Sequence, residues 1–316
     1  MKRALQFMGA GPTTLPDVVA PVARLADELG YESLWAGQRV ACPEPPLPPP
    51  FNFPSRSPSH DPIVALTYVA SQTQRVRLGT GVLVLPFHHP AVLAKQVAGL
   101  DVLSKGRLIC GIGVGYMEPE FRTLGVPFRE RGRRTDECLD AMQALWTMDK
   151  PAYHGQFFTI ENIDAWPRPV QHPLPIVVAG KGPLAFRRAV TRGHGWYGGP
   201  LNLEQTAQCL AGLREAASQH ERPSHLGRLE ISVGPVPEAG VKSPDAIHRY
   251  EDLGVDRLIF WPFGPWAWPR LDGTPWVLPI PVVPDPNAMT AAVMALPVAK
   301  LVEMASAFLH EYAPPR

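Results

Sequence analysis

Two glycine-rich segments have the residue types and spacing that could bind a ligand. Gly111, Gly113 and Gly115 alternate at the end of one apolar segment. A dinucleotide-binding fingerprint needs a third glycine three positions after the second, and this chain has Tyr116 there. We therefore reject that interpretation. Two others remain open: a backbone that lies close to a flat ligand, or a strand that bends tightly at a barrel mouth.

The second segment, Gly180-Lys181-Gly182-Pro183, follows another apolar segment. Glycines at a strand end leave backbone N–H groups accessible. Pro183 suits the first position of a helix, whose positive end favours a phosphate. Lys181 would add a positive charge. The alternative is an ordinary turn between a strand and a helix.

A third candidate is Arg39, which follows an otherwise apolar segment. It is either a charge held over a ligand or a surface arginine that pairs with a nearby acid. His88 and His89 are adjacent, so they would converge poorly on one metal, and we expect them to cap and pack the helix that follows. The four cysteines also lack metal-ligand spacing, so we predict no metal site; they are Cys42, Cys110, Cys138 and Cys209.

Alternating strands and helices must position these residues. The apolar pattern predicts strands over 4–8, 33–36, 76–85, 107–113, 176–179, 195–197, 229–233 and 256–260. It predicts helices over 15–29, 61–73, 90–103, 129–148, 183–192, 204–219, 243–254 and 288–310, and a small hairpin over 153–160. Eight such units favour a closed (β/α)8 TIM barrel, with the active site at the carboxyl ends of the strands.

The composition predicts one large domain over residues 1–316. Hydrophobic residues make up 45% of the chain and the formal net charge is +1, so neither nucleic acid nor an anionic membrane is an expected partner. There is no apolar run long enough for a membrane span. The scattered cysteines and the lack of a normal signal peptide predict a cytoplasmic location.

Two segments stand out as insertions. The proline-rich stretch near 42–60 cannot be a regular element, and long loops of this kind are usually functional or mobile. The segment near 261–286 is rich in tryptophan and proline. Its tryptophans either cover the barrel mouth and contact a hydrophobic substrate or fill a dimer interface.

Three stretches of the chain resemble a known family. They are LADELGYESLWAGQRV, the run DPIVALTYVASQTQRVRLGTGVLVLPFHHP that continues to GIGVGYMEPEF, and PVQHPLPIVVAGKGPLAFRRAVTRGHGWY. They are similar to luciferase-like monooxygenases, and especially to the branch of oxidoreductases that depend on the deazaflavin coenzyme F-420. The resemblance is dense over residues 1–200. It implies a bacterial-luciferase-like barrel and a homodimer.

The resemblance also implies where a cofactor would lie. The ring would occupy the barrel mouth, supported by a bulge at Gly81-Val82 that often contains a non-proline cis peptide. The segment after the fourth strand would line the ring, and the turn after the fifth strand would hold the phosphate. The implied cofactor-binding residues are Thr80, Gly81, Val82, Gly113, Val114, Gly115, Ala179, Gly180, Lys181 and Gly182.

The implied catalytic residues depart from the family pattern. Gln38-Arg39 stands where many deazaflavin enzymes have Asp-His, and Tyr116 stands where some have glutamate. Arg39 is too basic to be a general acid. It could still stabilise an anionic reduced deazaflavin or a substrate oxygen. Gln38, Arg39 and Tyr116 are therefore the catalytic candidates.

The expected function is hydride transfer between a deazaflavin coenzyme and a small organic substrate, with the cofactor carrying the chemistry. One alternative is a monooxygenase that uses oxygen and reduced flavin mononucleotide (FMN) from a separate reductase. An alternative of another class is a protein that binds flavin or deazaflavin without turnover.

Overall fold

The computed structural model describes residues 1–6, 8–45, 55–236, 243–261 and 291–315. Its strands are β1 (Lys2–Gln6), β2 (Ser33–Ala36), β3 (Arg77–Thr80), β4 (Leu83–Val84), β5 (Leu108–Gly113), β8 (Ile176–Ala179), β9 (Gly195–Leu201), β10 (Glu230–Pro235) and β11 (Arg257–Phe260). All neighbours pair in parallel, and the sheet closes because β1 pairs with β11 and β3 pairs with β5. With β3 and β4 counted as one interrupted strand, this is an eight-stranded barrel, which confirms the predicted fold class.

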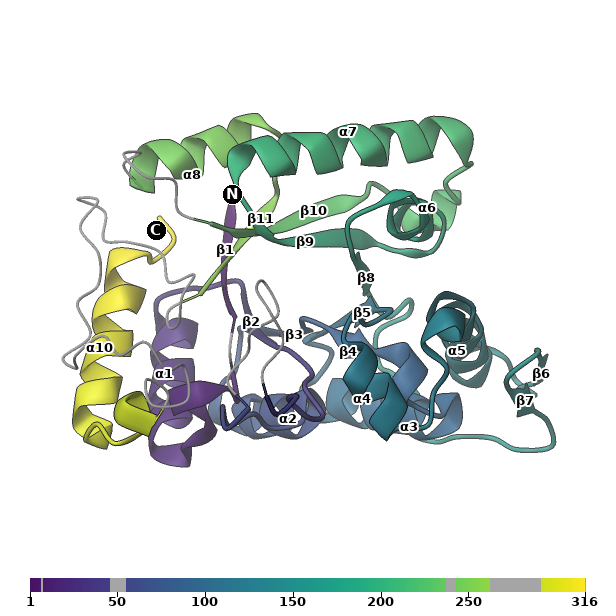
Figure 1. Ribbon diagram of the computed structural model, residues 1–316, viewed down its shortest axis with the longest axis horizontal. Helices are drawn as coiled ribbons and strands as arrows, with labels where there is room; N and C mark the ends of the chain where they lie inside the picture. The colour runs from purple at the N-terminus through teal and green to yellow at the C-terminus, as the bar shows by residue number, and fades with distance from the viewer. Residues whose placement is uncertain (7, 46–54, 237–242, 262–290, 316) are drawn as a thin grey trace.

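Helices cover the outside of the barrel (Figure 1). They are α1 (Pro16–Glu28), α2 (Pro62–Gln72), α3 (Pro90–Leu103), α5 (Arg131–Thr147), α6 (Pro183–Arg192), α7 (Leu203–Gln219), α8 (Ser243–Asp252) and α10 (Val298–Glu311). Smaller elements are α4 (Glu118–Thr123), the hairpin β6 (Tyr153–His154) with β7 (Thr159–Ile160), and 3-10 turns at Gly11–Thr14, Leu85–Phe87, Phe128–Glu130 and Ser224–Leu226. No helix among the described residues is long and apolar enough to cross a membrane.

Local sequence explains several helix starts. Asp61 accepts hydrogen bonds from the backbone N–H groups of Ile63 and Val64, and Pro62 occupies the first turn of α2. Asn202 and Gln205 form a reciprocal capping box at the start of α7. These side chains satisfy donors that a helix cannot satisfy internally.

The structure corrects several predicted elements. The strand predicted over 76–85 is wrong as one element, because Gly81-Val82 interrupts it with a cis peptide bond. The strand predicted over 195–197 continues to Leu201, and α4 was not predicted. The last helix, predicted over 288–310, is interrupted: residues 291–294 are helical, the chain turns before Pro297, and α10 begins at Val298. Residues 46–54, about half of the first predicted insertion, and residues 262–286, nearly all of the second, lie outside the described residues.

The barrel interior is built around Trp35. Its side chain is 0% exposed, and its indole N–H donates to Ser33 Oγ at 2.8 Å. A Cβ atom on Gly79 would lie 2.3 Å from the Trp35 ring, and one on Gly111 would lie 1.8 Å from the Thr80 carbonyl oxygen. Glycine on β3 and β5 is therefore what allows a large aromatic ring inside a narrow barrel. The ring packs among Ala4, Ile109, Val177, Tyr197 and Ile259.

A buried ionic cluster fills the amino-terminal end of the barrel. The Arg257 side chain is 0% exposed. It bonds to both carboxylate oxygens of Glu32 at 2.7 and 2.8 Å, to Glu230 at 2.9 Å and to Ser232 Oγ at 2.8 Å. Because a buried charge without partners would be very unfavourable, these bonds are needed to keep Arg257 inside.

We expect Gly79→Ala to destabilise the protein by about 1–3 kcal/mol, because the added methyl group overlaps the Trp35 ring. The matched control is Gly99→Ala on α3, where a Cβ would meet no atom within 4 Å. That change should leave stability unchanged or raise it by up to about 1 kcal/mol. Urea unfolding of the two variants makes the comparison. Equal stabilities would mean that the barrel accommodates both changes alike and that Trp35 does not dictate glycine at 79.

His194 makes stability depend on pH. Its Nδ1 accepts the Ile176 N–H at 3.1 Å, and its Nε2 is buried without a hydrogen-bond partner among the described residues. Burial, with smaller effects from Arg222 and His225, lowers the pKa of His194. The folded state thus resists protonation, so stability is full above the unfolded pKa of about 6.5 and falls as the pH drops through it. His194→Asn keeps an acceptor near Nδ1 but does not titrate, so its unfolding free energy should vary less with pH over that range.

Some pH dependence should remain in His194→Asn, because burial also lowers the pKa of His88. Identical pH profiles for the wild type and His194→Asn would contradict this assignment.

Candidate functional site

The carboxyl-terminal end of the barrel, here called the mouth, is lined mainly by glycines. Side chains alternate between the two faces of each strand, so the register gives the positions above the Trp35 layer that face inward. They are Gln6, Gly37, Gly81, Gly113, Ala179, Gly199, Gly234 and Trp261, and the Trp261 Nε1 would lie 3.3 Å from a Cβ on Gly234. A Cβ on Gly37 would lie 2.9 Å from the Gly81 carbonyl oxygen, and one on Gly199 would lie 3.2 Å from the Gly234 backbone. Backbone therefore forms much of this surface.

Three hydrogen bonds fix the Gly81-Val82 bulge and the preceding Thr80. The Gly81 N–H donates to the Ala36 carbonyl at 2.7 Å, and the Gln38 N–H donates to the Val82 carbonyl at 3.2 Å. Thr80 Oγ1 donates to the Gly111 carbonyl at 2.7 Å. The peptide bond is cis, as the resemblance implied. Val82 packs against the interior cluster, so the bulge places a branched apolar side chain at the mouth.

Gln6, at the end of β1, is a polar residue of the mouth that sequence reasoning missed. It is 3% exposed, and its Nε2 donates to the Gly81 carbonyl at 3.3 Å. Its Oε1 is buried without a hydrogen-bond partner in the described part of the chain. The one signal that could have revealed it is a carboxamide in an otherwise apolar strand, since buried polar groups are normally satisfied.

Arg39 lies at the centre of a second cluster at the mouth. Its guanidinium donates to Glu120 Oε2 and to Tyr116 Oη, both at 2.6 Å. Glu120 is 4% exposed and also accepts the N–H groups of Val40 and Ala41 through Oε1, at 2.8 and 3.3 Å. Burial alone would lower the pKa of Arg39, but Tyr116 and Glu120 outweigh it and the pKa is raised. Arg39 is therefore a permanent cation with an acid partner, and it is in contact with Tyr116, another of the catalytic candidates.

The Gln38 side chain has partners outside the Arg39 cluster. Its Oε1 accepts the Val84 N–H at 2.8 Å, and its Nε2 lies 2.9 Å from His88 Nε2. Gln38 thus ties the loop after β2 to the segment after the bulge. The neighbouring His89 accepts the Ala91 N–H through Nδ1 and caps α3, which confirms the capping prediction.

The turn after β8 combines glycine geometry with the start of α6. Gly180 and Gly182 have φ values of +133° and +135°, which side chains rarely adopt. Trp196 donates to the Gly180 carbonyl at 2.9 Å and fixes the turn, while Lys181 Nζ donates to the Pro200 carbonyl at 3.1 Å. Gly182 is the N-cap of α6 and offers no capping side chain. The first N–H groups of α6 are thereby left to an external acceptor or water.

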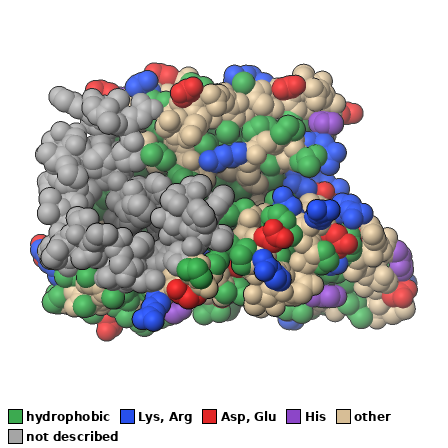
Figure 2. Space-filling view, viewed as in Figure 1, with side chains coloured by type: hydrophobic (Ala, Val, Ile, Leu, Met, Phe, Trp, Pro, Cys, Tyr) green, Lys and Arg blue, Asp and Glu red, His purple; other side chains and the backbone are tan. Residues whose placement is uncertain are grey.

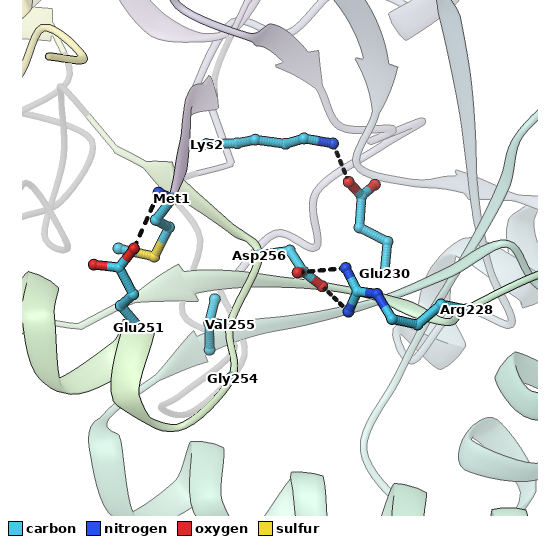
Figure 3. A pocket seen from close by; sticks show the side chains of 8 residues that line it. All are labelled: Met1, Lys2, Arg228, Glu230, Glu251, Gly254, Val255 and Asp256. Atoms are coloured by element: carbon cyan, nitrogen blue, oxygen red, sulfur yellow. Dashed lines mark hydrogen bonds and ion pairs between the residues drawn. The ribbon is translucent and has the colours of Figure 1, made fainter.

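The opposite end of the barrel holds a pocket of about 540 Å³ (Figure 3). Its charged groups pair with one another: the Met1 amino group with Glu251, Lys2 with Glu230, and Arg228 with Asp256. The amino-terminal end of such barrels generally serves stability. This pocket is therefore not the candidate site. Among the described residues, no group of three or more His, Cys, Asp or Glu side chains could hold a metal ion.

Two features distinguish this end of the barrel. Backbone takes the place of side chains at its glycines, and a helix start without a capping side chain lies beyond β8. The predicted ring-contacting residues on β3 and β5 and the turn after β8 all lie at this same end of the barrel. No hydrogen bond between described residues joins Lys181 to the Arg39 cluster, so the two charged groups are separate parts of the site.

Comparison with known proteins gives a consistent result. The family model described as luciferase-like monooxygenase matches residues 6–255. The chain is 34% identical over 196 residues to an F420-dependent glucose-6-phosphate dehydrogenase of Kineococcus radiotolerans, covering 61% of this chain and 55% of that protein. It is 32% identical over 192 residues to the oxygenase component of a flavin-dependent trigonelline monooxygenase of Acinetobacter baylyi, covering 60% of this chain and 50% of that protein.

A solved structure shares the whole fold. The coenzyme F420-dependent tetrahydromethanopterin reductase of Methanopyrus kandleri superposes with a TM-score of 0.67 at 15% identity, covering 99% of each chain. At that identity the likeness concerns the fold alone. The family model spans most of the chain, including the mouth and the turn after β8. The protein therefore belongs to the luciferase-like monooxygenase family.

Proposed function

We propose that this protein is an oxidoreductase that transfers a hydride between deazaflavin coenzyme F420 and a small organic substrate. The observation that carries the proposal is the mouth itself. Glycines 37, 81, 113, 199 and 234 bring backbone, in place of side chains, to the surface of the mouth, where a flat ring could stack. The F420-dependent relative, which is 34% identical to this chain over 196 residues, supports the choice of ring.

In this proposal, the predicted cofactor residues have two tasks. Thr80, Gly81 and Val82 support one face of the ring, while Gly113, Val114 and Gly115 line its side. The turn from Ala179 to Gly182 holds the phosphate through N–H groups at the start of α6, and Lys181 adds charge. Such positioning is the protein's contribution when a cofactor carries the reaction.

A bound deazaflavin would supply the hydride chemistry. Arg39 and Tyr116 would handle the proton and the substrate oxygen. Because the Tyr116 oxygen accepts from the Arg39 cation, the phenol keeps its hydrogen as a donor, and the cation stabilises the oxygen when that hydrogen is given up. Glu120 holds Arg39 in place, and Gln38 positions the loop that carries it.

A second candidate is an FMN-dependent monooxygenase supplied with reduced flavin by a separate reductase. The specific support is the Acinetobacter baylyi relative, which is the oxygenase component of a flavin-dependent monooxygenase. The same mouth can accept either ring, because the two ring systems have nearly the same outline.

We further propose that the protein is a cytoplasmic homodimer. The helix α2 contains no charged residue, and its exposed side includes Val64 at 65% and Tyr68 at 40% exposure. It packs beside α3, on which Val92 is 57% exposed. An apolar surface of this kind on adjacent helices is typical of a self-association interface. All four cysteines are free thiols, which fits a reducing compartment.

The cofactor assignment is tested by titrating purified apo-protein with F420 and, separately, with FMN, and following fluorescence quenching. We expect tight binding of F420 and weak binding of FMN. Tight binding of FMN alone would overturn the first proposal in favour of the monooxygenase. Binding without any substrate-dependent oxidation would favour the non-catalytic alternative.

The phosphate assignment has its own test in Lys181→Gln. If Lys181 contacts the phosphate, this change should weaken FMN binding about tenfold, the value of one charge-assisted hydrogen bond. The affinity for riboflavin, which has no phosphate, should stay the same. Parallel titrations with the two ligands give the result. An equal loss for both would show that Lys181 acts on the ring or on the fold and not on the phosphate.

A further inference from the structure

The Tyr197 hydroxyl reaches the mouth and has no hydrogen-bond partner among the described residues. Tyr197 belongs to β9, and its ring packs against Trp35 inside the barrel, with 5.8 Å between the ring centroids. The hydroxyl extends into the next inward-facing layer, where it would lie 3.2 Å from a Cβ on Gly199 and 3.3 Å from one on Gly234. Buried hydroxyls are normally hydrogen-bonded. A ligand in the mouth is therefore the acceptor that fits this donor.

The state and surroundings of the hydroxyl suit it for donation. Burial raises the pKa of Tyr197, so the phenol keeps its proton at neutral pH. Its side chain is 7% exposed, whereas Trp35 and Ile259 in the same cluster are 0% exposed. An alanine at position 199 or 234 would bring a methyl carbon into close contact with Oη. Glycine at both positions keeps side chains of β9 and β10 away from this donor.

The layer around the hydroxyl carries no charge at its inward-facing strand positions. Those positions are the glycines of the mouth together with Gln6, Ala179 and Trp261. Charged side chains lie on the outer surface, and Figure 2 shows Lys and Arg gathered between α6 and α5. A carboxylate or phosphate beside Tyr197 would lose its hydration without gaining a counter-charge. The group that meets this hydroxyl should therefore be an uncharged oxygen.

Strand order places Tyr197 across the barrel from the Gly81-Val82 bulge. Going round the closed sheet, β2, β1 and β11 separate β10 from the bulge on one side, and β5, β8 and β9 separate them on the other (Figure 1). A ring stacked on the bulge would thus turn its other face towards β9 and β10. Arg39 and Tyr116 follow β2 and β5, which both pair with β3, so Tyr197 offers a separate contact.

We propose that Tyr197 binds the substrate by donating a hydrogen bond from its hydroxyl to an uncharged carbonyl or alcohol oxygen. This inference deepens the proposed function and rests on it, because it assumes that a cofactor ring stacks on the bulge. It narrows the substrate class to compounds whose inner end bears such an oxygen and excludes those that would bring a carboxylate or phosphate there.

The first measurement separates a ligand contact from a structural one. Tyr197→Phe removes the hydroxyl and keeps the ring on Trp35. Because the hydroxyl has no partner in the described part of the chain, stability of the cofactor-free protein in urea should stay the same or rise. Tyr250→Phe is the contrasting control, since its buried hydroxyl donates to the Leu201 carbonyl at 2.8 Å and its loss should lower stability. A comparable loss in Tyr197→Phe would overturn the inference.

The second measurement identifies what the hydroxyl binds. Protein loaded with oxidised F420 is titrated with acetophenone and with cyclohexanone, and binding is followed by saturation-transfer NMR. The oxidised cofactor has no hydride to give, so the ketones bind without reacting. Each ketone is compared with the hydrocarbon in which a CH2 group replaces the carbonyl oxygen, and acetophenone also with benzoate.

We expect the wild type to bind a ketone about fivefold more tightly than its hydrocarbon, the range of one neutral hydrogen bond, and to bind benzoate more weakly than acetophenone. Tyr197→Phe should lose the preference for the ketone. Tyr153→Phe, which removes a hydroxyl from the β6–β7 hairpin, should keep it.

The other outcomes are distinguishable. If the wild type prefers no ketone over its hydrocarbon, or if Tyr197→Phe keeps the preference, the inference is overturned and the cofactor site stands. Weaker F420 binding by Tyr197→Phe without any ketone would place the hydroxyl on the ring and would overturn the inference as well. If F420 fails to bind the wild type, the proposed function is overturned and this inference with it.

Discussion

The constraint on which the rest of this structure depends is the presence of the Trp35 ring inside a closed eight-stranded barrel. The ring is 0% exposed, and the strands opposite it can close only because positions 79 and 111 have no side chain. A Cβ on Gly81, one layer higher, would lie 3.2 Å from the same ring. The packing of the core therefore requires glycine up to the mouth. The backbone surface at the mouth is thus a consequence of the same residue that fills the interior.

The two ends of the barrel differ in how their polar groups are paired. Below Trp35, the Arg257 guanidinium lies 5.7 Å from the ring and is neutralised by Glu32 and Glu230, so this end is closed by charges that satisfy one another. Above Trp35, backbone and small residues leave polar groups such as Gln6 Oε1 without a partner among the described residues. Buried polar groups normally have hydrogen-bond partners. The amino-terminal end, where the charges are paired, is therefore assigned a structural role, and the mouth, where Gln6 Oε1 has no partner among the described residues, is the candidate place for a ligand.

Much of the fold could be predicted from the sequence because its signals are local. Helix starts at Asp61 and Pro183 and the glycine turn after β8 depend on neighbours a few residues away. The parts that were missed depend on distant partners. Glu120 meets Arg39 across 81 positions and Gln6 meets Gly81 across 75, and neither pairing has a sequence pattern. The interruption at Gly81-Val82 was foreseen through the family resemblance, while the apolar pattern alone predicted an unbroken strand.

The Arg39 cluster shows how the departures from the family pattern fit together. The sequence left two interpretations of Arg39, a charge held over a ligand or a surface arginine paired with an acid. The structure shows the acid partner, since Glu120 bonds to Arg39 at 2.6 Å, but the Arg39 side chain is only 18% exposed. The pair is close to neutral, so it adds little general attraction for anions at the centre of the mouth. Directional hydrogen bonding through Tyr116 remains there, which suits a substrate oxygen. Positive charge without acid partners lies instead beside the turn after β8. On this distribution of charge, the substrate would be recognised by geometry at Arg39 and Tyr116, and the anionic part of a cofactor by electrostatics near α6.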